Sequence, residues 1–192
     1  ANMSKTPVVL VTASLTAAIA VIATLLLATG TRGQNTSLAS SAGQLEITTV
    51  ASGLVNPWAL AFLPDGKMLV TERPGRISLV SGLREGARRT TVRADLDDVY
   101  AQGEGGLLGM VVHPDFATSR QFTTCQTHQV GGEPEDIRLV TWRLSADGRS
   151  AEQVKTLLSG LPISTGRHSG CRPELAADGA LLVGTGDTAQ GD

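Results

Sequence analysis

Aromatic residues are scarce in this sequence, where they account for only 3% of the 192 residues. Glycine, by contrast, occurs 22 times, and the apolar runs between the glycines are mostly short. A chain of this kind favours many turns and short strands over long helices. After Gly30, no segment shows the apolar stripe of an amphipathic helix. The composition therefore predicts one strand-rich domain of ordinary size.

An excess of either charge is also missing. The chain has 16 basic and 18 acidic residues, which gives a net charge of −2, and both kinds are scattered along its length. Proteins that bind nucleic acid need a basic stripe or patch that neutralises phosphates. The charge pattern therefore excludes nucleic acid as a partner.

Cysteine occurs only twice, at Cys125 and Cys171. Neither belongs to a CxxC pair, and no histidines stand at zinc-ligand spacing, so we expect no structural metal site of this kind. In an oxidising compartment the two could form one disulfide, whereas in a reducing one they would be buried thiols. The two residues alone leave both possibilities open.

One long apolar run, Pro7–Thr29, stands apart from the rest of the chain. It contains no charged residue, while Lys5 stands before it and Arg32 after it. About 20 apolar residues suffice for a membrane-spanning helix, whereas the apolar part of a cleaved signal peptide has about 7–15. The alternative, a buried core helix, is disfavoured by the extreme N-terminal position.

We therefore predict a transmembrane or signal-peptide helix over residues 1–30, followed by a flexible linker over the small, polar residues 31–43. Residues 44–192 then form the folded domain. A membrane-targeting segment at the N-terminus places this domain outside the cytoplasm, in the periplasm or secreted, with the helix as its contact to the membrane.

From Gln44 onward, strand-like runs alternate with turns that contain Pro, Gly and Asp. The expected strands are Trp58–Phe62, Lys67–Thr71, Arg76–Val80, Leu107–Val112, Gln121–Gln126, Ile137–Leu144, Pro173–Ala176 and Ala180–Gly184. A strand–turn–strand unit recurs at Asp65, Asp115 and Asp178, at intervals of 50 and 63 residues. A repeat of that length is typical of β-propeller blades, while a β-sandwich of about seven strands is the alternative. We predict an all-β fold with about three blades.

Three motifs carry a resemblance to a known family. They are Asn56–Gly66 with Leu69–Arg73, Gly103–Gly109 with His113–Phe116, and His168–Arg172 with Gly184–Asp187. Together and in this order they resemble the glucose/sorbosone dehydrogenase family, the soluble PQQ-dependent aldose dehydrogenases. The resemblance covers Gln44–Asp192, so it includes nearly everything after the N-terminal segment.

The resemblance implies a six-bladed β-propeller that binds PQQ and calcium at one end of its central channel, of which this chain would supply the N-terminal part. It also implies oxidation of an aldose sugar or related alcohol, with electrons passed on to a quinone or another acceptor. His168 falls where the family places its catalytic base, and Asp187 where an aspartate orients that histidine. Such a pair suits base chemistry near neutral pH, while hydride transfer belongs to the cofactor.

Three further positions fall near the sugar by the same resemblance. Glu104 stands where the family often has Gln, Gln190 lies in a loop with substrate-side amides, and Arg167 stands where some members have an acidic residue. The run from His168 to Leu175 also departs from the usual family pattern. Because Arg167 and the run from His168 to Leu175 both differ from the family pattern, the substrate can differ from that of other members.

Each site residue also has a purely structural interpretation. An isolated loop histidine is often only solvated, Glu104 among glycines could be an exposed turn residue, and Asp187 could be a turn or capping residue. We assign His113 to its turn and His128 to no site. We interpret Cys171 as a structural residue that is paired with Cys125 and has no redox role.

In the family, most PQQ ligands and the calcium ligands lie in the second half of the protein, which has no counterpart here. We therefore expect that this chain alone does not bind PQQ tightly or turn over sugar, and we assign it no metal ligand. The alternative function is a non-catalytic, membrane-tethered propeller that acts as a binding or accessory module.

Overall fold

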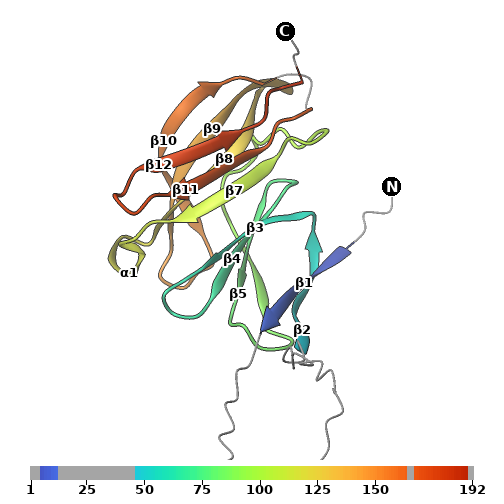
Figure 1. Cartoon of the computed structure of the whole chain (residues 1–192), viewed down its shortest axis with the longest axis vertical. Helices are drawn as coiled ribbons and strands as arrows, with labels where there is room; N and C mark the ends of the chain where they lie inside the picture. The colour runs from blue at the N-terminus through green and yellow to red at the C-terminus, as the bar shows by residue number, and fades with distance from the viewer. Residues whose placement is uncertain (1–4, 13–45, 164–166, 190–192) are drawn as a thin grey trace, which may run out of the picture.

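The computed structural model describes residues 5–12, 46–163 and 167–189. These residues form strands almost throughout, with one four-residue helix (Figure 1). The elements are β1 (Lys5–Thr12), β2 (Glu46–Val55), β3 (Pro57–Phe62), β4 (Met68–Glu72), β5 (Arg76–Val80), β6 (Arg89–Val92), β7 (Leu107–Val112), α1 (Phe116–Ser119), β8 (Gln121–Val130), β9 (Glu133–Leu144), β10 (Ala151–Leu161), β11 (Cys171–Leu175) and β12 (Leu181–Thr185).

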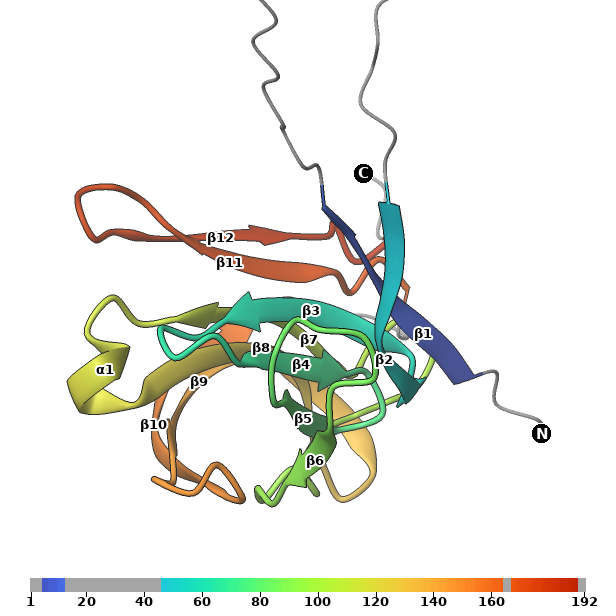
Figure 2. The same cartoon turned by 90° about the horizontal axis from the view of Figure 1, so that it is seen from below.

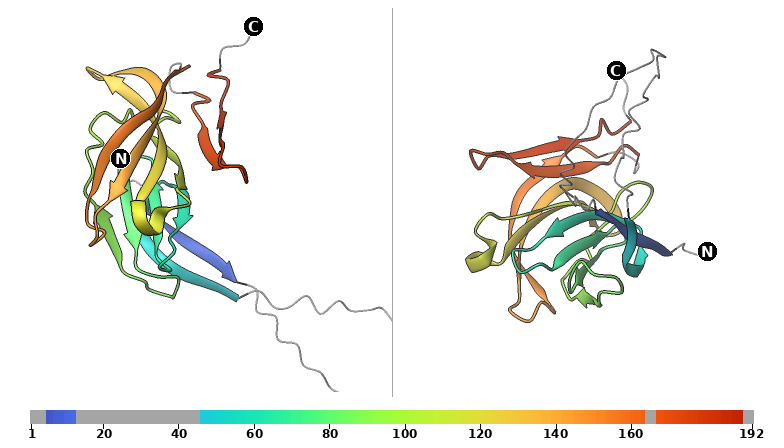
Figure 3. Two further views of the ribbon diagram at one scale, coloured as in Figure 1. Left: turned by 90° about the vertical axis from the view of Figure 1, so that its left-hand side faces the viewer. Right: turned by 60° about the horizontal axis from the view of Figure 1, so that its bottom comes forward.

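The sheets are built from consecutive antiparallel strands. Strands β3 to β6 form one four-stranded sheet and β7 to β10 form the next, while β11 and β12 pair as a hairpin. The first strands lie next to one another, because β7 contacts both β3 and β11 (Figure 2). The sheets thus follow each other in chain order (Figure 3). Among the described residues, no strand crosses from one four-stranded sheet into the other.

The all-β prediction is confirmed, and each strand expected from the sequence is present with small shifts at its ends. The repeated aspartate turns also have one topological position, because Asp65, Asp115 and Asp178 each lie between the first and second strand of a sheet. At Asp65 and Asp178 the carboxylate accepts the amide hydrogen bond of the residue two positions later, at 3.2 and 3.0 Å. This is a common way for aspartate to close a turn.

Besides β1, three strands were not expected from the sequence, namely β2, β6 and β10. Strand β6 has the polar sequence RTTV, and β10 is exposed over nearly its whole length. Both lie at the outer edge of their sheets, where main-chain pairing with a neighbour defines the strand and no apolar alternation is required.

The predicted N-terminal helix is wrong for its first residues, because Lys5–Thr12 form strand β1, which pairs antiparallel with β2. This segment consists mostly of β-branched residues, which favour extended backbone. Residues 13–45, with the rest of the apolar run and the predicted linker, lie outside the described residues. In the described ranges, the structure contains no helix of sufficient length and hydrophobicity to cross a membrane.

The main hydrophobic core lies between the two four-stranded sheets. Leu69 and Ile77 of the first sheet pack in one cluster with Phe122 and Trp142 of the second. The indole of Trp142 donates a hydrogen bond to the Thr124 hydroxyl at 2.8 Å, so its polar group is satisfied. Burial of each such large side chain stabilises the fold by about 1.5–3 kcal/mol, and together these contacts hold the two sheets side by side.

A buried carboxylate joins β2 to the first four-stranded sheet. Glu72, at the end of β4, is fully buried. It accepts hydrogen bonds from the Val55 amide at 2.5 Å and the Ser78 hydroxyl at 2.7 Å, and the Arg89 guanidinium lies 3.8 Å away. A buried charge is tolerated when it is both hydrogen-bonded and paired. This network fixes the main chain just before Arg73.

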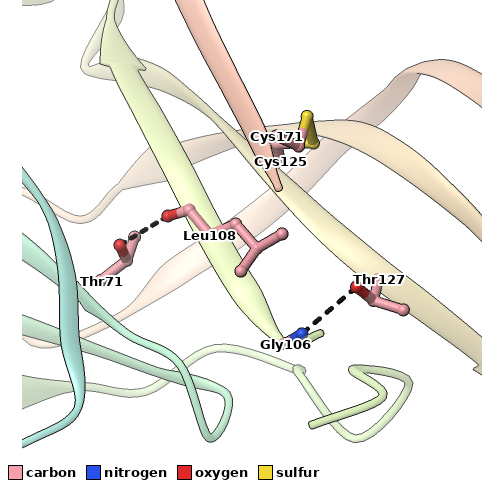
Figure 4. The surroundings of a disulfide bond; sticks show 6 residues. All are labelled: Thr71, Gly106, Leu108, Cys125, Thr127 and Cys171. Atoms are coloured by element: carbon pink, nitrogen blue, oxygen red, sulfur yellow. Dashed lines mark hydrogen bonds between the residues drawn. A yellow bond between two sulfur atoms is a disulfide. The ribbon is translucent and has the colours of Figure 1, made fainter. Parts of the chain in front are cut away.

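A disulfide between Cys125 and Cys171 joins β8 to the β11–β12 hairpin (Figure 4). Both cysteines are buried, and they pack in a small cluster with Leu108, Ile137 and Leu139. The two cysteines are thus paired, which is one of the two possibilities that the sequence alone had left open. The bond closes a loop across 46 residues and limits how far the hairpin can move away from β7.

We predict that replacing both Cys125 and Cys171 with alanine lowers the free energy of unfolding by about 2–4 kcal/mol, because the unfolded chain loses a cross-link. Urea denaturation followed by fluorescence measures this change. A reductant should lower the midpoint of the natural protein by a similar amount and leave the double variant unchanged. A natural protein that is insensitive to reductant under unfolding conditions would contradict this role.

Candidate active site

His168 and Asp187 lie at the same end of the β11–β12 hairpin, because one precedes β11 and the other follows β12. The two chain segments are held together there by the hydrogen bond from the Gly186 amide to the Gly170 carbonyl, at 2.9 Å. Gly186 must lack a side chain, because a Cβ there would collide with the His168 carbonyl. This close approach places the two functional side chains next to each other.

The imidazole of His168 contacts Asp187 directly, with 2.6 Å between Nδ1 and the carboxylate Oδ1. The same oxygen accepts the Ala189 amide hydrogen bond at 2.9 Å. With a carboxylate on Nδ1, that nitrogen carries the proton and Nε2 is left as the acceptor. The histidine side chain is 47% exposed and that of the aspartate 76% exposed, so the pair is accessible to a ligand.

The hydrogen bonds from the Ala189 amide and from the His168 ring lower the pKa of the Asp187 carboxyl below its ordinary value. A carboxyl whose pKa is lowered by folding adds stability above its ordinary pKa, and loses it as the pH falls through the lowered value. Asp187 therefore stays ionised throughout the range in which an imidazole works as a base.

Glu104 joins this pair from the loop between β6 and β7. Its Oε2 accepts the main-chain amide hydrogen of His168 at 2.5 Å. His168 has a positive φ of 51°, a conformation that is uncommon for a residue other than glycine and costs about 1–3 kcal/mol. The charge-assisted hydrogen bond from the main chain to Glu104 stabilises this conformation.

A cavity of about 570 Å³ lies beside the hairpin and opens to solvent. Its lining comes from β3, β7 and both strands of the hairpin: Pro57, Trp58, Gly109, Gly170, Cys171, Arg172, Gly184, Thr185 and Gly186. Trp58 offers a large exposed aromatic surface and Arg172 a cation. Glycines 170 and 186 connect this cavity to the segments that carry His168 and Asp187.

The described residues do not form a complete site for PQQ and calcium. PQQ carries three carboxylates, whereas the cavity lining includes Arg172 as its only cation. Within the described ranges, no group of three or more His, Cys, Asp or Glu could hold a metal ion. These residues therefore do not by themselves account for the binding of PQQ or calcium.

The two remaining site residues that the sequence predicted are Arg167 and Gln190. Arg167 is exposed and directly precedes His168, and its carbonyl accepts a hydrogen bond from the Ser169 hydroxyl at 3.4 Å. Gln190 lies outside the described residues. The substrate contacts proposed for both stay predictions.

Sequence reasoning missed a second histidine–aspartate pair. His128 Nδ1 lies 2.8 Å from Asp98 Oδ2, and Gln126 donates to the other oxygen at 3.2 Å. Because these partners are about 30 residues apart and belong to no motif, only the fold brings them together. His113 contacts Thr123 at 2.8 Å, and burial lowers its pKa. Neither histidine lies with His168.

Replacing His168 with alanine removes one of the two donors that stabilise the ionised Asp187. We expect the pKa of Asp187 to rise toward its ordinary value of 3.8 without reaching it, because the Ala189 amide remains. An NMR titration of the aspartate side-chain carboxyls measures this shift.

Asp147 serves as the control, since Ser145 and Arg149 lower its pKa and it has no contact with His168. Its titration should be the same in both proteins. An Asp187 titration that is unchanged by the His168→Ala substitution would disprove the contact in solution.

Comparison with known proteins gives this site its context. The family model described as Glucose / Sorbosone dehydrogenase matches residues 54–192. The aldose sugar dehydrogenase YliI of Escherichia coli (strain K12) is 32% identical over 159 residues, which cover 81% of this chain and 42% of that protein. Quinoprotein glucose dehydrogenase B of Acinetobacter calcoaceticus is 30% identical over 146 residues, covering 72% and 30% respectively.

This chain is also similar to solved structures of sugar dehydrogenases. The PQQ-bound form of aldose sugar dehydrogenase from Streptomyces coelicolor superimposes with a TM-score of 0.65 at 32% identity, covering 73% of this chain and 41% of that one. The chain thus spans less than half the length of the relatives it matches. From the matched residues and this structural likeness, we conclude that the chain belongs to the glucose/sorbosone dehydrogenase family.

Proposed function

We propose that this chain contributes the catalytic base to a PQQ-dependent dehydrogenase that oxidises an aldose sugar or a related alcohol, with His168 as that base. The observation that carries the proposal is the His168–Asp187 contact beside an open cavity. Family membership supports a sugar substrate and an oxidoreductase activity. The name of the Streptomyces structure and that of the Acinetobacter relative support PQQ as the cofactor.

In the proposed reaction, a sugar hydroxyl donates its proton to Nε2 of His168 as the hydrogen on the same carbon leaves as hydride. Asp187 keeps the proton of the ring on Nδ1, and it stabilises the imidazolium that forms. PQQ, when bound, supplies the hydride acceptor, and the electrons then pass to a quinone or another acceptor. Base catalysis of this kind contributes about 10²–10⁴-fold to rate.

We propose that the two four-stranded sheets and the hairpin are successive blades of a six-bladed β-propeller. The adjacency of β3, β7 and β11 supports this, because the first strand of each blade lines the channel of a propeller. The loops that carry Glu104, His168 and Asp187 then lie at one end of that channel. The calcium ligands and most groups that hold PQQ would come from blades that follow this part of the fold.

We further propose that the intact protein works outside the cytoplasm. The disulfide between Cys125 and Cys171 supports an oxidising compartment, where such bonds form and persist. Of the uncharged run Pro7–Thr29, the residues after β1, 13–29, are those that support targeting to the membrane, as an anchor or as a signal segment.

The test uses the intact protein reconstituted with PQQ and calcium, and a dye-linked assay with aldose sugars. We expect His168→Ala to lower kcat by about 10²–10⁴-fold, since the base is lost, and KM to change much less. His113→Gln is the matched control, because His113 lies at the opposite end of β7, where its ring contacts Thr123. This variant should retain the activity of the natural protein.

Undiminished turnover by the His168→Ala variant would remove His168 from this role. A natural protein that binds aldoses in the presence of PQQ and calcium, yet oxidises none of them, would favour the alternative of a non-catalytic, membrane-tethered binding module.

A further inference from the structure

We propose that Arg73 is a positioning residue for the base: it fixes the loop of Glu104, and Glu104 in turn holds the main chain of His168. The inference rests on the proposed function of His168, but its chain of contacts can be tested without turnover. Arg73 lies in the turn between β4 and β5, far from His168 in the sequence.

The guanidinium of Arg73 contacts the loop on both sides of Glu104. Its Nη1 donates to the Gly103 carbonyl at 2.6 Å and to the Gly105 carbonyl at 2.9 Å. The two acceptors are the residues immediately before and after Glu104, so the pair of hydrogen bonds restricts the direction in which the Glu104 side chain leaves the loop. Hydrogen bonds from an ionised donor are shorter and stronger than neutral ones.

The main chain of Arg73 is itself fixed to two sheets. Its amide donates to the Asn56 carbonyl, and its carbonyl accepts the Leu107 amide, each at 2.9 Å. Gly106 packs so closely on Arg73 that any Cβ at position 106 would overlap the Arg73 carbonyl. The arginine is thus a rigid support, held in place before its side chain reaches the loop.

The loop has a second attachment on its other side. The Gly106 amide donates to the Thr127 hydroxyl at 3.2 Å, and the Thr127 amide donates to the Gly106 carbonyl at 3.0 Å (Figure 4). These bonds secure the loop where it enters β7. Arg73 secures the preceding residues, where Glu104 lies, so the two attachments have separate effects.

Glu104 links the position of its loop to the position of the base, His168. Its carboxylate accepts the His168 amide hydrogen, in a residue whose φ of 51° needs support from its surroundings. If the Glu104 loop moves, the main chain of His168 loses this bond, and the ring can leave Asp187. The Arg73 side chain therefore acts on the base through one intermediate residue, Glu104.

The first measurement needs no turnover. In the intact protein, Arg73→Met should raise the pKa of Asp187 toward its ordinary value of 3.8, as loss of the His168 contact does. Asp147 should titrate as before. Arg120→Met is the matched control, since its guanidinium also donates to two main-chain carbonyls, those of Leu144 at 2.9 Å and Ser145 at 2.6 Å, and it directly precedes β8, at the opposite end of that strand from Thr127. It should leave the Asp187 titration unchanged.

The second measurement is turnover after reconstitution with PQQ and calcium. We expect Arg73→Met to lower kcat about 10–100-fold, a smaller loss than removal of the base itself, with KM changed less than threefold. Arg73→Lys keeps one cationic donor for the two carbonyls and should recover part of kcat. Arg73→Met combined with Glu104→Ala should be no worse than Glu104→Ala alone, because both interrupt one sequence of contacts.

Glu104→Gln completes the set, because its amide oxygen still accepts the His168 amide hydrogen and should preserve the Asp187 titration. If Arg73→Met does not fold, Arg73→Lys is compared with Arg120→Lys by both measurements. Arg73 variants that match their Arg120 controls in both the Asp187 pKa and kcat would overturn the proposal. If Arg73→Met alters the pKa of Asp187 but His168→Ala is fully active, the positioning role of Arg73 stands and the proposed function of His168 is rejected.

Discussion

The structure depends on how closely the first strands of successive sheets pack together. The Thr71 hydroxyl donates to the Leu108 carbonyl at 2.7 Å, and the Leu107 amide donates to the Arg73 carbonyl at 2.9 Å, so the first sheet is bonded directly to β7. The Cys125–Cys171 disulfide joins the second four-stranded sheet to the β11–β12 hairpin. These few polar and covalent links set the alignment between sheets that apolar packing alone leaves less well defined.

This alignment gathers the chemistry at one end of the sheets. Glu104 and His168 are separated by 64 positions in the chain, yet they meet because they precede β7 and β11, which lie in contact. The disulfide between β8 and β11 supports this arrangement. Strand β7 is buried over most of its length, while Glu104 and His168, in the loops before β7 and β11, are exposed. A rigid scaffold with functional loops is a common arrangement in enzymes, because it limits the freedom of the reacting groups.

The sequence predicted the elements that have strong local signals. Turns such as that at Asp65 and apolar strands such as Leu107–Val112 were expected because turn chemistry and hydrophobicity are properties of neighbouring residues. Edge strand β6 was missed because its polar sequence, RTTV, lacks the apolar alternation by which a half-buried strand is recognised. The motif resemblance predicted His168 beside Asp187, but it could not show that Glu104 binds the His168 main chain or that Arg73 holds Glu104. Those contacts depend on three-dimensional alignment between separate sheets.

The central claim is that His168 takes the proton of the sugar hydroxyl while Asp187 holds the other side of its ring. The most direct measurement is a crystal structure of the intact protein with PQQ, calcium and an aldose bound. The account predicts that Nε2 of His168 lies within about 2.6–3.2 Å of the hydroxyl on the carbon to be oxidised, with Nδ1 still on Asp187. A sugar bound elsewhere, with His168 turned to solvent, would contradict it.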